Sequence, residues 1–164
     1  MVLEKLFEVA TSYLEKNDFG VAHTRRVLEI ARAHFDIPKD IEELTLASIV
    51  LHDIGGSTVK EQYEKGPNIA KGLLFQLGYG SDFIQEVCEM IRTHHEHPKN
   101  PSLSFKILYD SDKLVMFSPE EYPLYNSRLS FNWDEVITLI YHEHIKNLAR
   151  GALQERKAIP AYEI

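Results

Sequence analysis

The sequence predicts an all-α fold, a compact single-domain bundle of about seven or eight helices over residues 1–164. Apolar residues recur at helical spacing along most of the chain, and strand signals are weak, with no Asn-Gly hairpin between alternating runs. No internal repeat or composition shift marks a second domain. A chain of 164 residues is long enough for one core that buries about two-thirds of the unfolded surface.

The first three helices are expected at about residues 2–16, 20–35 and 39–53. The first is an amphipathic helix that ends at "KNDFG", where Gly20 is the expected stop. Pro38 in "DIPKD" separates the second helix from the third. Toward its end the third helix is apolar on much more than one face, so we expect this end to lie centrally in the fold.

The stretch "GGSTVKEQYEKGP" is predicted to be a polar loop, long enough to cover a site. Helices follow at about 67–77 and 81–94, the latter capped by Ser81 with Asp82. Residues 102–117 fit a helix better than two short strands. Two further helices are expected in "NWDEVITLIYHEHIKNLA" and "RGALQERKA".

The amino-acid composition and the net charge limit the kinds of molecule that the protein is expected to bind. A net charge of -7 and a pI near 5.6 argue against nucleic acid as a standing partner, whereas a small phosphorylated substrate needs only one local positive centre. No stretch approaches the roughly 20 apolar residues of a membrane span, and the N-terminus lacks the features of a targeting segment. Cys88, the only cysteine, is predicted to be a small buried hydrophobic residue, and a cytoplasmic location is expected. The oligomeric state is not indicated.

Histidines and aspartates stand on apolar stripes or at the ends of the expected helices. They are His23, His52, Asp53, His94, His95, Asp110 and Asp112. Alone, such a histidine is more often a satisfied core residue, and such an aspartate more often a capping group. Together they favour a metal site, because a buried carboxylate costs several kcal/mol unless it is paired, and few basic residues lie nearby. Nitrogen and oxygen ligands without thiolate suit one divalent transition metal ion, Fe, Mn, Co, Ni or Zn.

The order of these motifs resembles the HD superfamily of metal-dependent phosphohydrolases. The matching segments are "AHTRRVLEIA", "ASIVLHDIGG" and "LYDSDKLVMF", and the resemblance covers about residues 20–117. It implies an all-α bundle of the HD-domain type, with the C-terminal helices packing on this motif core. It also implies that four residues bind the metal: His23, His52, Asp53 and Asp112. Asp110 lies in the same segment, but the family's liganding carboxylate usually precedes the basic residue and leucine, which favours Asp112.

The resemblance also implies a reaction, the hydrolysis of a small phosphate ester by a metal-activated water. The substrate is a nucleotide or another phosphorylated metabolite, and the enzyme is a phosphomonoesterase or a phosphodiesterase. Asp53 would ligate the metal, orient the water and stand as the candidate to take its proton. The segment "MIRTHHEH" resembles the family's Ile-x-x-His element and places His94 at the site as a phosphate contact, an acid for the leaving group, or a ligand.

The sequence departs from the family pattern, and these departures affect the expected number of metal ions and the expected substrate-binding residues. Two-metal relatives often have a further histidine where this chain has "QYEKGPNIAKG", so one metal is favoured over two unless His95 and Asp110 help to hold a second ion. Gly56 stands where a basic residue often follows the His-Asp doublet. Lys60 is therefore a candidate for substrate binding, with Arg92 next, although each fits a plain surface residue better.

The sequence says less about the role of four other histidines. His95 is a further candidate for substrate binding, whereas His97 is expected at a solvated helix end, and His142 and His144 on a surface helix.

One alternative function is a regulatory or ligand-binding module without turnover, which the lack of a basic cluster favours. Another is a di-iron, oxygenase-like relative, against which the missing histidine argues.

Overall fold

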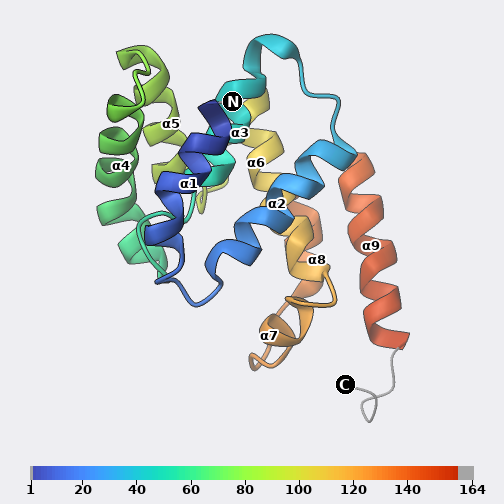
Figure 1. Cartoon of the computed structure of the whole chain (residues 1–164). Helices are drawn as coiled ribbons and strands as arrows, with labels where there is room; N and C mark the ends of the chain where they lie inside the picture. Colours follow the sequence, from blue (N-terminus) through green and yellow to red (C-terminus); the bar gives the residue numbers. More distant parts are fainter. Residues whose placement is uncertain (1, 159–164) are drawn as a thin grey trace. The chain divides into compact units, whose positions relative to one another are not determined.

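The computed structural model describes residues 2–158, and all regular secondary structure in this range is helical, which confirms the all-α class (Figure 1). The α-helices are α1 (Val2–Leu14), α2 (Gly20–His34), α3 (Lys39–Leu51), α4 (Val59–Gln76), α5 (Ser81–Thr93), α6 (Leu103–Leu114), α7 (Tyr122–Asn126), α8 (Trp133–Leu139) and α9 (Glu143–Ala158). A 3-10 helix, η1 (Val115–Phe117), directly follows α6. The chain divides into two compact units, residues 1–108 and 109–164. Its organisation as one domain stays a prediction.

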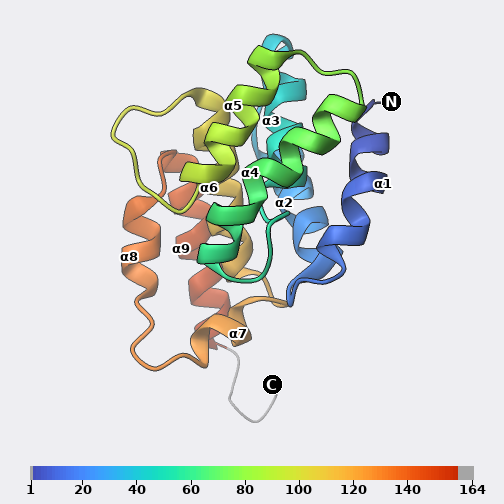
Figure 2. The ribbon, with the colours of Figure 1, turned by 90° about the vertical axis from the view of Figure 1, so that its left-hand side faces the viewer.

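Helix α3 forms the centre of the first unit. Its residues 45–51 are all buried, which confirms the expectation from the apolar end of this helix. Helices α1, α2 and α5 all pack against α3, and α4 packs along α5 in a helical hairpin joined by residues 77–80 (Figure 2). The first three helices start and end within two residues of the predicted bounds. None of the helices in residues 2–158 is long and apolar enough to cross a membrane.

Helix α4 begins eight residues earlier than predicted, so the expected long loop is wrong. Thr58 is its N-cap: the Thr58 hydroxyl accepts a hydrogen bond from the Glu61 N–H (3.1 Å) and donates one to Glu61 Oε1 (3.0 Å). The bond from the Glu61 N–H is the N-cap half of a capping box, for which "TVKE" is the sequence signature. The helix continues through Pro67, although proline has no N–H for the intrahelical bond. Only a short turn therefore follows the His-Asp doublet.

Two smaller expectations about α5 also change. The N-cap is Gly80, and Ser81 and Asp82 lie in the first turn of the helix without a side-chain capping bond. Cys88 is half-buried rather than buried, and its thiol donates a hydrogen bond to the Pro67 carbonyl (3.3 Å). Burial raises the pKa of the Cys88 thiol above its usual value. The cysteine thus links α5 to the proline of α4.

The second unit contains a break between α8 and α9 where one continuous helix was predicted. Asp110 is fully buried, and its carboxylate accepts hydrogen bonds from the N–H groups of Tyr141 (2.8 Å) and His142 (2.9 Å) and from His142 Nδ1 (2.6 Å). These bonds take backbone donors that a continuous helix would use. The helical prediction is therefore wrong for His142, which lies half-buried in the break, whereas His144 is exposed on α9.

The core of the second unit is rich in aromatic side chains. The Trp133 ring packs against Phe117 (4.8 Å between centroids), Tyr122 (4.7 Å, stacked) and Phe131 (4.7 Å). Its Nε1–H donates to the Asn126 side chain (3.0 Å), so the buried indole keeps its hydrogen bond. This cluster anchors the segment between η1 and α8.

Candidate metal centre

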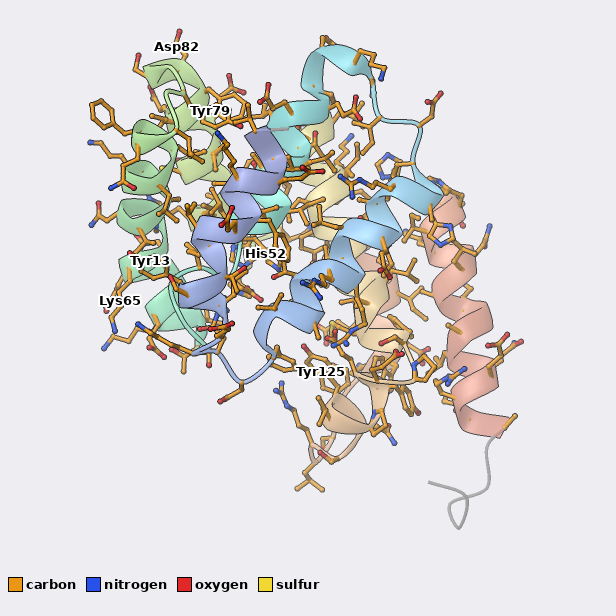
Figure 3. All side chains as sticks on the ribbon, in the orientation of Figure 1. Tyr13, His52, Lys65, Tyr79, Asp82 and Tyr125 are labelled. Atoms are coloured by element: carbon orange, nitrogen blue, oxygen red, sulfur yellow. The ribbon has the colours of Figure 1, made fainter. Side chains whose placement is uncertain are left out.

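His52 directly follows the last residue of α3 and is fully buried in the first unit (Figure 3). Its Nδ1 donates a hydrogen bond to the Ile49 carbonyl (2.6 Å), which lies in the last turn of α3 and also accepts the long cap bond from the His52 N–H (3.5 Å). A neutral imidazole protonated at Nδ1 carries its electron pair on Nε2. The helix end therefore determines which nitrogen of His52 is a ligand atom.

His94 repeats this arrangement at the end of α5. It is 2% exposed, and its Nδ1 donates to the Ile91 carbonyl (2.6 Å). Both histidines thus belong to an Ile-x-x-His sequence in which the isoleucine carbonyl orients the ring. Nε2 of His94 is buried without a hydrogen-bond partner among the described residues and lies 3.6 Å from Asp53 Oδ1. This nitrogen is available for a ligand or for proton transfer.

Three electron-rich atoms converge at the doublet. Nε2 of His23, on α2, lies 3.3 Å from His52 Nε2 and 3.3 Å from Asp53 Oδ2, and the last two atoms are 3.4 Å apart. Ligands bound at about 2.1 Å to one transition-metal ion are separated from one another by about 3.0–3.4 Å. His23 and His52 are buried and the Asp53 side chain is 14% exposed, so the carboxylate is largely out of water, where it needs a compensating charge. The donor set and its spacing therefore fit a divalent cation.

Asp53 faces two groups of candidate ligands. Its Oδ2 belongs to the triangle with His23 and His52, whereas its Oδ1 faces His94. Asp53, His94 and His95 each offer a ligand atom, and these three atoms lie within 4.8 Å of one another. Asp53 could therefore bind a separate ion through each of its two carboxylate oxygens. The expectation of a single metal ion stays a prediction.

Side chains outside the ligand set hold the doublet in place. Asn17 Nδ2 donates to the Asp53 carbonyl (2.7 Å), and the Ser57 hydroxyl accepts from the Asp18 N–H (2.9 Å), so the turn after α1 is tied to the doublet. Gly55 lies against α4 so closely that a Cβ there would be 2.6 Å from the Glu61 carbonyl oxygen. No motif marks Asn17 in the sequence, because "KNDFG" has the composition of an ordinary turn.

Asp112 and Asp110 lie in the second unit on α6. The Asp112 carboxylate is mostly buried and lies 3.9 Å from Lys113 Nζ, and its role as a metal ligand stays a prediction. Both carboxylate oxygens of Asp110 accept hydrogen bonds from residues 141 and 142. These bonds account for the burial of Asp110 without a metal ion.

The predicted substrate-binding residues lie in exposed positions of the first unit. Lys60 belongs to the first turn of α4 rather than to a flexible loop, and its Nζ is 4.0 Å from Glu64. Arg92 on α5 pairs with Glu89 (2.8 Å). His95 is exposed but hydrogen-bonded to a buried glutamine, and His97 is exposed, as expected. The substrate-binding roles of Lys60, Arg92 and His95 stay predictions.

Comparisons with known proteins show the family and the fold of this chain. The HD domain family matches residues 20–116, more than half of the chain, so the chain belongs to the HD domain family, a family of metal-dependent hydrolases. A solved structure described as a predicted HD superfamily hydrolase from an uncultured Thermotogales bacterium superposes with a TM-score of 0.64 at 22% identity, covering 94% of this chain and 87% of that one. This likeness shows a shared fold. No curated protein matches the sequence.

Proposed function

We propose that the protein is a phosphohydrolase that uses a divalent metal ion to cleave a small phosphate ester. The observation that carries the proposal is the convergence of His23 Nε2, His52 Nε2 and Asp53 Oδ2 at 3.3–3.4 Å. Membership of the HD domain family supports hydrolysis. The net charge of -7 supports a small substrate rather than a polyanion.

His23, His52 and Asp53 would hold the ion, and Asp112 is proposed as a further ligand. When bound, a divalent cation lowers the pKa of a coordinated water and polarises a phosphoryl oxygen. Asp53 would use its two oxygens differently. Oδ2 faces the two histidine nitrogens, while Oδ1 faces away from them toward His94, where it is placed to accept a proton from the attacking water.

His94 is the proposed acid for the leaving group. Because its Nδ1–H is bound to the Ile91 carbonyl, only Nε2 exchanges protons with the site. Nε2 is buried beside Asp53 Oδ1, so a proton accepted by the carboxylate has a short route to the imidazole. General acid catalysis of this kind typically contributes about 10²–10⁴-fold to the rate.

The positive charge for the phosphate is expected from the cation, and from His94 once its Nε2 has accepted a proton. Lys60 and Arg92 are each paired with a glutamate of their own helix, so neither is an uncompensated cation. Such exposed pairs contribute little to stability and open at low cost, so a bound substrate could still recruit one of them. Substrate affinity should therefore depend more strongly on the metal than on either side chain.

Metal analysis and a phosphorylated-metabolite screen with Mn²⁺, Co²⁺, Ni²⁺ or Zn²⁺ test the proposal together. We expect His23→Ala and Asp53→Ala to lose both bound metal and turnover. His34→Ala is the matched control, because His34 is exposed on the same helix as His23. Turnover that survives in Asp53→Ala would refute the assignment of the site.

A ligand-binding module without turnover is the second candidate. The pairing of Lys60 with Glu64 and of Arg92 with Glu89 favours it, because the site then lacks a free basic side chain for phosphate in these two positions. Stoichiometric metal binding with no hydrolysis of any phosphate ester in the screen would support this candidate. Two iron atoms per chain with a visible absorption band would instead support an oxygenase-like relative.

A further inference from the structure

Gln62 bridges the turn after the doublet and the histidine pair at the end of α5. It lies on α4 and is 6% exposed. Its Nε2 donates a hydrogen bond to the Gly56 carbonyl (3.0 Å), and its Oε1 contacts Nε2 of His95 at hydrogen-bonding distance. A buried amide needs partners at both ends, and Gln62 has them. Nothing in the sequence motifs marks this residue.

The two partners determine the orientation of the amide. The Gly56 carbonyl only accepts hydrogen bonds, so the NH₂ group of Gln62 must face it. A flipped amide would set two acceptor oxygens against each other at 3.0 Å. With Oε1 facing His95, the imidazole must donate from Nε2. A neutral His95 then carries its electron pair on Nδ1.

The neighbouring histidine has the opposite arrangement. His94 is protonated at Nδ1 by its bond to the Ile91 carbonyl and carries its electron pair on Nε2. A ligand atom of each histidine lies within 4.8 Å of the other and of an Asp53 oxygen. Two adjacent residues therefore carry their electron pairs on different ring nitrogens, and each ring is oriented by a different element, α5 for His94 and α4 for His95.

We propose that Gln62 is a positioning residue that fixes the proton of His95 on Nε2 and so leaves Nδ1 as the acceptor atom of this ring. The close approach of Gly55 to α4 supports this role, because a Cβ on Gly55 would lie 2.8 Å from Gln62 Cα. Gln62 is thus held at a fixed distance from the turn that carries Asp53. The use of the His95 acceptor in catalysis rests on the proposed function, but the protonation pattern does not.

Imidazole ¹⁵N NMR tests the proposal directly, since the nitrogen shifts and their couplings to the ring protons distinguish the two tautomers. The full-length protein is measured at about pH 8, where an ordinary histidine is neutral, and a His95→Ala variant assigns the signals. We expect wild-type His95 to be protonated at Nε2. Gln62→Leu should shift it toward a mixture of tautomers.

Two further variants make the test selective. Gln62→Glu keeps an acceptor for His95 but cannot donate to Gly56, so Nε2 of His95 should stay protonated. Gln76→Leu makes the hydrophobic change at an exposed glutamine on the same helix and should leave the His95 signals unchanged. If Gln62→Leu does not fold, the tautomer of His95 in the wild type and in Gln62→Glu still tests the role of Gln62.

The NMR results can overturn the role of Gln62 without bearing on the proposed phosphohydrolase activity. Protonation of wild-type His95 at Nδ1, an unchanged tautomer in Gln62→Leu, or loss of the Nε2 proton in Gln62→Glu would each overturn the role of Gln62. These readouts need neither metal nor substrate, so they stand even if no phosphate ester is cleaved. If hydrolysis is found, Gln62→Leu should lower kcat by about 10–100-fold with a smaller change in KM, and Gln62→Glu should retain more activity.

Discussion

Replacing Gly55 with alanine should destabilise the first unit through a purely steric effect. A Cβ at this position would lie 2.6 Å from the Glu61 carbonyl oxygen, 2.7 Å from the Gly66 nitrogen and 2.8 Å from Gln62 Cα. All three are main-chain atoms, so no side-chain rotation relieves the contacts. The turn must move away from α4 by several tenths of an ångström, and overpacking of this kind typically costs about 1–3 kcal/mol.

The same displacement stretches the hydrogen bond from Gln62 Nε2 to the Gly56 carbonyl, now 3.0 Å. Its loss adds about 0.5–1.5 kcal/mol. We therefore expect Gly55→Ala to lower the free energy of unfolding by about 1.5–4.5 kcal/mol in total. Urea denaturation followed by circular dichroism measures this change, and metal titration of the folded variant reports whether Asp53 has moved with the turn.

Gly72→Ala is the matched control, because it makes the same substitution on α4 where no heavy atom lies within 4 Å of the added Cβ. Alanine is the better helix former by about 0.5–1 kcal/mol, so this variant should be more stable than the wild type. The two substitutions should thus move the unfolding midpoint in opposite directions. A Gly55→Ala protein as stable as Gly72→Ala would refute the close packing of the doublet turn on α4.

Three further predictions concern single contacts. Asn17→Ala removes the bond to the Asp53 carbonyl and should cost about 0.5–1.5 kcal/mol of stability and weaken metal affinity, as thermal melts and metal titration would show. Asp110→Asn keeps one acceptor oxygen and replaces the other with a donor, so the backbone N–H of Tyr141 or of His142 loses its acceptor. This change should cost about 1–3 kcal/mol in urea unfolding; an unchanged midpoint would contradict the structural role of this carboxylate. Burial raises the pKa of the Cys88 thiol, so the folded protein contains less thiolate than the unfolded chain at about pH 8, and its alkylation should be slower there than in urea.

Much of the helical framework could be predicted because helices are local. The apolar periodicity places α2 and α3 within two residues of their observed bounds. The start of α4 was also encoded locally, in the capping bond between Thr58 and Glu61, but the polar composition of the segment favoured a loop. In this segment the capping bond, rather than the polar composition, determines where the helix begins.

The break before α9 has a different origin. It depends on Asp110, which lies more than 30 positions before the backbone N–H groups of Tyr141 and His142 that it binds. The residues around the break have ordinary helical spacing, so the local sequence predicts a continuous helix. A contact between segments far apart in the chain overrode that preference.

The sequence by itself determined the kinds of side chain that could bind a metal in this protein and the orientation of two of them. In both Ile-x-x-His segments the histidine bonds a carbonyl three residues earlier, so its orientation depends only on where the helix ends. Only the tertiary structure decided that His23 lies 3.3 Å from Asp53, and that Gln62 faces His95. The two residues of each pair are about 30 positions apart and lie on, or directly after, different helices, so their distances depend on how the helices pack, which no local pattern specifies.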